Sequence, residues 1–425
     1  MSKGRHTPGS SASKVNPGRR AAVRALLRVN RGERGDHALE AEAPPAGKDR
    51  ALAWHLHSGA LQHRAELDHI ISACSSRPLA RLDPAVLAIL RVALFELRHG
   101  RAPDRAVVHQ AAELTRLEAS RHVVGFVNAV LRNRSRAGEI PPRVLLNHPE
   151  WLLARWEARY GPEQAADWAR RNNQPPPLCI ATAGDLAELD ALLAQAGLEP
   201  EAAQAAGMDV PGMLRVLGPV GQVGALPGAA EGRWWVQDAA AAAVADMVGC
   251  KPGWRVLDAC AAPGGKTFRL ISQGADLLSV DRSATRLEHT QQGLDRLGMT
   301  AKLQQHDWLE GPLEAVGLMD AVLVDAPCSG LGTLRRHPEI RWRRKSEDLV
   351  QNAHRQFAIL KRCSTLVRPG GVLVYAVCSA EPEEGEGVAQ RFLAQNGDFV
   401  QDAVFCSAPP TSGEDAFWAA RLLRG

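Results

Sequence analysis

The sequence predicts a multidomain protein in which an all-helical bundle is followed by a small α/β module and then a doubly wound α/β domain. Three observations predict this arrangement. The chain has 425 residues, enough for two or three ordinary domains. Apolar residues recur at helical spacing through its first third. After Trp235, apolar runs of strand length alternate with longer helical patterns, which is typical of a mostly parallel sheet.

The N-terminal third is predicted to be helical and basic. Residues 1–16 are rich in Ser, Gly, Lys and Arg, and we expect a disordered tail there. Residues 17–144 should form the bundle, because turn signals separate helical stripes and no strand-like alternation of comparable length interrupts them. These stripes begin at Ala21 and continue through 52–71, 84–97, 106–117 and 123–131.

The charge of the chain is divided unevenly. The first 140 residues carry 23 Lys and Arg against 13 Asp and Glu, whereas the remainder carries 28 against 34. Neutralising phosphates releases counterions and supplies affinity that does not depend on sequence. The asymmetry therefore favours a polyanionic partner for the bundle, with an ordinary basic surface as the alternative.

Two further domains are expected after the bundle. Residues 145–235 open with two helical patterns that end at three consecutive prolines, 175–177, and a small α/β module or a linker fits them. Residues 236–425 should form the doubly wound domain. Its strands are expected at 254–258, 277–281, 302–306, 319–325 and 372–377.

The cysteines and the hydropathy exclude several classes of protein. The eight cysteines show neither CxxC spacing nor another compact ligand cluster, so we expect no structural zinc site and no metal. No run of about 18 apolar residues could span a membrane, and residues 1–20 lack the apolar core of a secretory signal. We therefore expect a cytoplasmic protein with free thiols. Inert, buried packing is the expected role of Cys74, Cys179, Cys250, Cys363 and Cys406.

A turn of small residues follows the first predicted strand of the C-terminal domain. The strand ends at Asp258 and runs into Ala259-Cys260-Ala261-Ala262-Pro263-Gly264-Gly265-Lys266-Thr267. At the carboxyl end of a strand, such a turn lets the backbone approach a ligand. It lacks the GxGxxG pattern of a dinucleotide site. A Walker A loop would require glycine where Cys260 stands, and Pro263 removes an amide that such a loop offers to phosphate.

Aspartates end the successive strands of this domain. Asp281 lies 23 positions after Asp258, where a carboxylate usually binds ribose hydroxyls. Asp307 follows the third strand and could accept a hydrogen bond from an adenine amino group. Any one of them alone would more often be a helix cap or a turn residue. Their repetition after a glycine turn favours a nucleoside site without a pyrophosphate.

Two cysteines follow the fourth and fifth strands. Cys328 stands in Asp325-Ala326-Pro327-Cys328-Ser329-Gly330, and Cys378 follows the strand 372–377. Because the carboxyl ends of parallel strands meet at one edge of a sheet, both thiols should lie beside the nucleoside site. Spacing alone does not say which of the two thiols would attack a substrate.

Residues 256–267, 325–342 and 374–386 resemble the Sun/Nol/Nop family of RNA cytosine-5 methyltransferases. The most specific match is DAPCSGLGTLRRHPEIRW. The bundle resembles a NusB-type RNA-binding domain in residues 81–84, 88–91 and 126–132, and this pairing resembles bacterial enzymes that act on 16S ribosomal RNA. The resemblance implies a Rossmann-like class I methyltransferase domain that binds S-adenosylmethionine. The residues that it assigns to the cofactor are Cys260, Ala261, Ala262, Pro263, Gly264, Gly265, Lys266, Asp281, Asp307 and Asp325.

The resemblance also implies a role for each thiol. Carbon 5 of cytosine is a poor nucleophile, and addition of a thiolate at carbon 6 makes it reactive. Cys378 falls on the family's nucleophile position, Cys328 on the residue used for release, and Asp325 is placed to hold or protonate nitrogen 3. A reactive thiolate needs an electropositive neighbour, and Lys266 is the nearest candidate by motif.

A basic segment, residues 335–345, contains His337 and Trp342, a mixture suited to RNA phosphates and bases; a solvated helix start is the alternative. Two residues depart from the family pattern, since Val377 replaces threonine and Gly385 replaces asparagine.

We expect a monomer that acts on 16S ribosomal RNA before or early in small-subunit assembly and has no membrane partner. The alternatives are a methyltransferase for transfer RNA or protein, and a non-catalytic RNA-binding factor.

Overall fold

The computed structural model describes residues 15–218, 220–313 and 316–425, so most of the predicted N-terminal tail lies outside the described residues. The chain divides into two compact units. The helical unit extends to Leu153 and also includes His337–Trp342, and the sheet unit comprises Ala154–Arg336 and Arg343–Gly425. The predicted domain boundaries at residues 144 and 235 stay a prediction. Along the described residues, no helix is long and apolar enough to cross a membrane.

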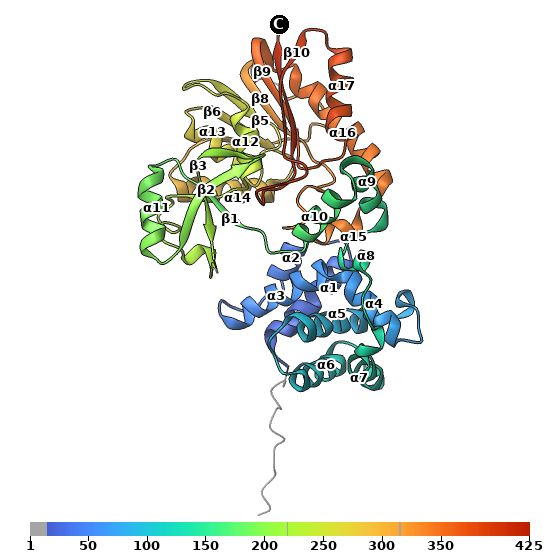
Figure 1. The fold of residues 1–425 in the computed structure, drawn as a ribbon. Coiled ribbons are helices and arrows are strands. Elements are labelled where there is room, and N and C mark those ends of the chain that lie inside the picture. Colours follow the sequence, from blue (N-terminus) through green and yellow to red (C-terminus); the bar gives the residue numbers. More distant parts are fainter. Residues whose placement is uncertain (1–14, 219, 314–315) are drawn as a thin grey trace, which may run out of the picture. The chain divides into compact units, whose positions relative to one another are not determined.

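The helical unit confirms the predicted all-helical bundle (Figure 1). Its central helix, α5, is buried along most of its length, and it begins where the Asp83 carboxylate accepts hydrogen bonds from the amides of Ala85 and Val86. Pro84 fills the first position, where its missing amide costs nothing. The helices are α1 (Pro17–Asn30), α2 (Gly35–Glu40), α3 (Lys48–Gln62), α4 (Arg64–Cys74), α5 (Pro84–His99), α6 (Asp104–Glu118), α7 (Val124–Arg132), α8 (Pro142–Leu145) and the start of α9 (Glu150–Tyr160).

One apolar stripe of the bundle spans two helices. The apolar stripe 52–71 is not one helix, because the chain leaves helical geometry at His63, with φ −99° and ψ 18°. The apolar periodicity continues across the break, so hydropathy alone did not reveal it. The junction between α3 and α4 is therefore a corner that places His63 outside both helices.

The sheet unit contains a seven-stranded sheet of order β10-β11-β9-β8-β5-β6-β7. The five predicted strands are confirmed as parallel neighbours, and an antiparallel hairpin that the sequence did not reveal extends the sheet beyond β9. The parallel strands are β5 (Arg255–Asp258), β6 (Asp276–Asp281), β7 (Lys302–Gln305), β8 (Met319–Asp325) and β9 (Val367–Val377), and the hairpin is β10 (Phe399–Cys406) and β11 (Trp418–Arg424).

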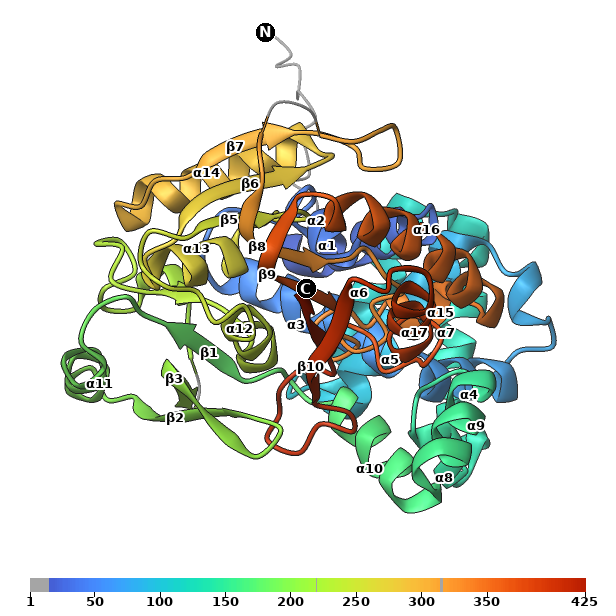
Figure 2. The ribbon, with the colours of Figure 1, turned by 90° about the horizontal axis from the view of Figure 1, so that it is seen from above.

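Helices cover both faces of this sheet (Figure 2). One apolar core joins the strands to α12 (Ala239–Asp246), α13 (Gly265–Ser272) and α14 (Ala284–Leu297). The other joins them to α16 (Ser346–Ser364) and α17 (Glu386–Gln395). Burial on both faces explains why the central strands are continuous apolar runs.

A small α/β module precedes this domain in the chain. The sequence left a module or a linker open there, and the structure shows the module. Its antiparallel sheet has the order β2-β3-β1-β4. The strands are β1 (Leu178–Ala181), β2 (Glu199–Ala205), β3 (Met208–Leu217) and β4 (Trp235–Val236). Helix α11 (Leu186–Gln195) packs on it, and α12 also contacts β2 and β3. Helix α10 (Pro162–Asn172) lies before the module in the chain.

The strand order positions the site. From β5 the chain proceeds through β6 to β7 on one side, and it then returns to build β8 and β9 on the other side. The order therefore reverses between β5 and β8. In open α/β sheets, ligands bind beyond the carboxyl ends of the strands at such a reversal.

Candidate active site

The turn after β5 is held against the neighbouring strand. The amide of Ala261 donates to the Val280 carbonyl, and the amide of Ala262 lies 3.2 Å from the Asp281 carboxylate. Gly264 has φ 108°, and a Cβ there would lie 2.7 Å from the Phe268 ring. A glycine is therefore required for both conformation and space.

A cavity of about 440 Å³ lies beside this turn, within the size range of small-molecule sites. Two of its lining residues have buried polar atoms without a hydrogen-bond partner among the described residues: Nε2 of Gln237 and Oδ1 of Asp258. Such atoms are costly unless a ligand or water satisfies them. The residues that line the cavity are Trp235, Val236, Gln237, Asp238, Ala241, Asp258, Cys260, Ala261, Ala262, Pro263, Gly265, Lys266, Phe268, Arg296 and Asp325.

Three of the predicted cofactor residues, Gly264, Asp281 and Asp307, are not among the lining residues of this cavity. The buried Asp281 carboxylate accepts from the amides of Ala262 and Ser283. Asp307 accepts from the amide of Leu309, so it caps its own turn. Both follow strands at the same edge as the turn, and Asp281 also fixes the turn in place.

The carboxyl group of Asp258 is held in an unusual state. Burial raises its pKa to about 7, even though the Thr267 hydroxyl, 2.9 Å from Oδ2, and the Lys266 ammonium lower it. The negative charges of Asp325 and Asp281 raise it further. Near neutral pH, this carboxyl group exchanges a proton that an ordinary aspartate has already lost.

The two predicted thiols lie side by side. Strands β8 and β9 are parallel neighbours with Asp325 opposite Ala376, so the residues that follow them meet at one edge. The Sγ atoms of Cys328 and Cys378 are 3.2 Å apart, and both side chains are half-buried. The hydrogen bond with Cys378 and burial raise the pKa of Cys328 well above its usual range. Cys328 therefore stays a protonated donor beside the other sulfur.

A cation interacts electrostatically with one sulfur of this pair. Nζ of Lys266 is 2.7 Å from Oδ2 of Asp325. Burial lowers the pKa of Lys266, but the charge of Asp325, its hydrogen bond and the nearby Cys378 raise it above its usual value. The ammonium group thus stays charged within electrostatic range of the Cys378 sulfur.

A buried glutamate supports the two thiol loops. Glu384 accepts from the amide of Ser329 at 2.7 Å and from its hydroxyl at 2.5 Å. Asn352 donates to the same carboxylate at 2.9 Å. Glu384 follows β9 in the chain and Ser329 follows Cys328, so these bonds fasten one thiol loop to the other. The sequence showed an acidic stretch after Cys378 but no signal that distinguished Glu384 within it.

The prediction that residues 335–345 meet RNA is wrong for several of them. The Arg336 guanidinium bonds Asp238 and Asp415. Arg341 is fully buried in the helical unit and donates to the Asn147 carbonyl, and Trp342 donates to the Leu61 carbonyl. Arg336 is thus engaged within the sheet unit, whereas Arg341 and Trp342 are engaged within the helical unit, to which His337–Trp342 belongs.

The expectation for the remaining cysteines holds only in part. Cys179 and Cys363 are buried, Cys74 and Cys250 are half-buried, and Cys406 is exposed on β10. Cys406 is thus no core residue, because its strand lies in the outer hairpin.

A turn of small residues after β5, aspartates at the next strand ends and a cavity at the reversal of strand order define a Rossmann-like methyltransferase. Comparisons with known proteins agree. The family model described as 16S rRNA methyltransferase RsmB/F matches residues 247–422, the NusB family matches 16–136, and a RsmF/B-like ferredoxin-like domain matches 148–210.

Relatives cover nearly the whole chain. Ribosomal RNA small subunit methyltransferase B of Klebsiella pneumoniae is 34% identical over 89% of this chain and 90% of its own. A probable ribosomal RNA small subunit methyltransferase B of Synechocystis is 32% identical over 88% and 87%. Among solved structures, PH0851 has a TM-score of 0.81 at 23% identity and covers 97% of this chain and 99% of its own. The chain belongs to the ribosomal RNA small subunit methyltransferase B family, and its cofactor is S-adenosylmethionine.

Proposed function

We propose that this enzyme methylates carbon 5 of a cytosine in 16S ribosomal RNA through a covalent adduct with Cys378, and that Cys328 assists release. The observation that carries the proposal is the thiol pair, whose sulfur atoms lie 3.2 Å apart beside the Lys266–Asp325 ion pair. Two thiols held together after β8 and β9, with Asp325 at the end of β8 lining the cavity, suit a reaction that needs one sulfur to add and a second group to assist release.

We further propose that the cofactor is held by the turn 260–266 together with Asp281, Asp307 and Asp325. The cavity and the unpartnered polar atoms of Gln237 and Asp258 support the part of this placement that involves the turn and Asp325. When bound, S-adenosylmethionine supplies a sulfonium methyl group, which is the electrophile of the reaction.

The residues of the chain account for the remaining steps. The Cys378 thiolate forms a bond to carbon 6 of the cytosine, and the electrons of the 5,6 double bond make carbon 5 nucleophilic enough to accept a methyl group. Asp325 in its acid form gives nitrogen 3 a proton when Cys378 adds, so that no negative charge builds up on the base, and it takes the proton back on release. The Lys266 ammonium stabilises the thiolate before attack and after release.

Release requires that carbon 5 pass its proton to a base, and the thiolate form of Cys328, which arises after Cys328 has given its own proton to water, is placed to accept it. The electrons of that bond restore the double bond, and Cys378 leaves as a thiolate. Cys328 is placed to assist, since its sulfur contacts that of Cys378.

The names of the relatives support 16S ribosomal RNA as the substrate. A cytosine must be unstacked to reach the thiols, which favours a loop or RNA that is not yet packed. A monomeric, cytoplasmic enzyme that acts before or early in small-subunit assembly belongs to the same proposal.

The test is transfer of a labelled methyl group to 16S ribosomal RNA by the wild-type protein and three variants. Cys378→Ala should abolish transfer. Cys328→Ala should accumulate a protein–RNA adduct that survives denaturing electrophoresis, because addition proceeds and release does not. Cys406→Ala removes an exposed thiol on β10, which is not among the proposed site residues, and should behave as wild type.

Methyl transfer by Cys378→Ala at the wild-type rate would overturn the covalent mechanism. An adduct formed by Cys378→Ala would instead reverse the roles of the two thiols. Bisulfite mapping of the labelled RNA then checks carbon 5, because 5-methylcytosine resists conversion to uracil whereas unmodified cytosine does not.

A further inference from the structure

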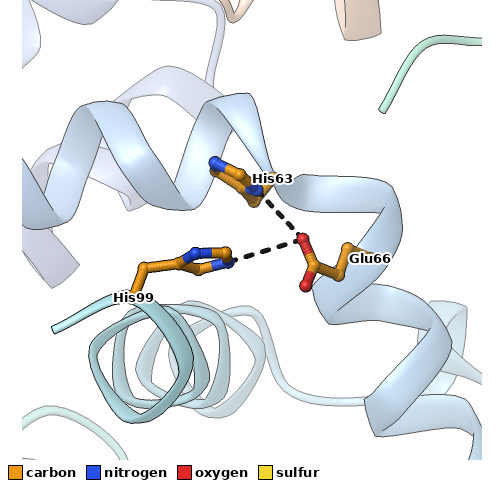
Figure 3. Close-up of side chains that lie close together, drawn as sticks. All are labelled: His63, Glu66 and His99. Carbon is orange, nitrogen blue, oxygen red and sulfur yellow. Dashed lines mark hydrogen bonds and ion pairs between the residues drawn. The ribbon is translucent and has the colours of Figure 1, made fainter. Parts of the chain in front are cut away.

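Two imidazoles and one carboxylate converge in the helical unit, outside the methyltransferase site (Figure 3). His63 lies at the corner between α3 and α4, Glu66 in the first turn of α4, and His99 is the last residue of α5. Oε2 of Glu66 is 2.9 Å from Nδ1 of His63 and 3.5 Å from Nε2 of His99. One carboxylate oxygen thus faces a nitrogen of each ring.

The spacing of these three atoms suits a metal ion. All three lie within 4.8 Å of one another. Zinc binds imidazole nitrogen and carboxylate oxygen at about 2.0–2.2 Å in tetrahedral geometry, which separates neighbouring ligand atoms by about 3.4 Å. The two oxygen–nitrogen distances lie on either side of this value, so small side-chain movements would bring all three atoms into coordination.

Neighbouring residues hold the Glu66 carboxylate so that one oxygen, Oε2, faces the two imidazoles. Nε of Arg98 donates to Oε1 of Glu66 at 2.6 Å, which leaves Oε2 to the two rings. The amide of Glu66 donates to Oδ1 of Asn147 at 3.0 Å, which fixes the start of α4. Outer contacts of this kind orient metal ligands.

An aromatic ring fixes the two imidazoles. The Phe95 ring stacks on His99, with centroids 5.1 Å apart, and lies 5.5 Å from His63. A Cβ on Gly59 would overlap this ring at 1.9 Å, so Phe95 has no room to withdraw on that side. The rings therefore rest on a rigid apolar base.

Solvent can reach the cluster. The side chains of His63 and His99 are 20% and 32% exposed, whereas Glu66 is 3% exposed. An ion could therefore enter from the surface and keep a water molecule in a fourth position. Three protein ligands with an open position are typical of catalytic zinc sites, while structural sites are closed.

We propose that His63, Glu66 and His99 bind a divalent transition-metal ion of the zinc class. The ion would join the α3–α4 corner to the end of α5 and so stabilise the helical unit in its folded form. The sequence led us to expect no metal. The three proposed ligands come from different helices and the corner between them, and they lack the short cysteine spacing that reveals a structural zinc site. Without an ion, the same residues form an ion-pair network with Arg98.

The test titrates metal-free, full-length protein with Zn²⁺ and with Co²⁺. Thiols can also bind these ions, so the electronic spectrum separates the two kinds of site. Cobalt bound by thiolates gives an intense sulfur-to-metal band, whereas cobalt bound by imidazole and carboxylate gives weak visible bands only. Wild type should show the weak visible bands and a rise in melting temperature with Zn²⁺.

The variants decide the assignment. His63→Ala and His99→Ala should each weaken this binding at least tenfold and remove the thermal shift, because each deletes one of three ligands. His109→Ala is the matched control, since it removes an exposed histidine of the same unit on α6. Far-UV circular dichroism checks that each variant is folded, and the isosteric Glu66→Gln replaces any variant that is not.

Equal affinity and equal thermal shift in wild type, His63→Ala and His99→Ala would overturn the proposal and leave the ion-pair network as the role of the cluster. None of these measurements involves methyl transfer, so the result does not depend on the proposed function.

Discussion

Replacement of Glu384 should loosen both thiol loops at once. The carboxylate is fully buried and holds the amide and the hydroxyl of Ser329 at 2.7 and 2.5 Å. In Glu384→Ala, the Ser329 amide loses its acceptor in a place that water does not reach. In Glu384→Gln, an amide oxygen can still accept from that amide, and the Ser329 hydroxyl can rotate to accept from the new NH₂ group.

The magnitude follows from the bonds that are lost. A hydrogen bond to a charged group contributes about 1.5–3 kcal/mol, and two such bonds from Ser329 give about 3–6 kcal/mol for Glu384→Ala. Glu384→Gln keeps both contacts but loses the charge, so about 1–2 kcal/mol is expected. Glu383→Ala is the control: its carboxylate is 35% exposed and pairs with Arg155, and such a pair contributes at most about 1 kcal/mol.

The assay is hydrogen exchange of the β8 and β9 amides over a urea series, which reports the stability of the sheet unit alone. Methyl transfer is measured in parallel. Its rate should fall most in Glu384→Ala, less in Glu384→Gln and least in Glu383→Ala, because Ser329 adjoins Cys328. The reasoning is refuted if Glu384→Ala and Glu383→Ala destabilise the strands equally, or if Glu384→Gln costs as much as Glu384→Ala.

Three further predictions concern protonation, packing and redox chemistry. Asp258→Asn should gain stability relative to wild type as pH rises from about 4 to 7, by up to about 4 kcal/mol in urea unfolding, with no further gain above pH 7. Burial raises the pKa of Asp258 in the folded protein from 3.8 to about 7, so between these values only the unfolded wild type loses the proton and the wild type is destabilised. Gly385→Asn, which introduces the residue of the family pattern, should lower the stability by about 1–3 kcal/mol and with it the melting temperature, because a Cβ there would lie 3.0 Å from the Trp418 ring. An unchanged melting temperature would show that the Trp418 ring moves aside. The oxidant diamide should take one hydrogen from each of Cys328 and Cys378, join their sulfur atoms, which lie 3.2 Å apart, in a disulfide and so stop methyl transfer. Dithiothreitol should restore methyl transfer, and peptide mapping that finds no disulfide between these cysteines would contradict the prediction.

The sequence predicted the parallel strands well and the hairpin not at all, and for β10 the reason is physical. Strands buried on both faces must be apolar throughout, so residues 319–325 and 372–377 were visible as strands. The strand β10 lies at the edge of the sheet, and most of its side chains are exposed. Its hydropathy therefore carries no strand pattern.

The site was predicted where local spacing determines it and not where tertiary contacts do. The turn 260–266 and both thiols follow strands, so topology alone brings them to one edge. By contrast, Arg341 looks like an exposed cation in the sequence but is fully buried. Its partner, the Asn147 carbonyl, is 194 residues away in the chain, a separation that no local pattern can reveal.

The division of labour between the thiols is where the structure adds most to the resemblance. Spacing treats Cys328 and Cys378 alike, but their surroundings differ. The hydrogen bond with Cys378, burial, and the charges of Glu384 and Asp325 all raise the pKa of Cys328, so this sulfur keeps its proton. The charge of Cys378 is among the causes that raise the pKa of the Lys266 ammonium. The proposal assigns attack to Cys378 and assistance of release to Cys328, the same assignment that the resemblance implies.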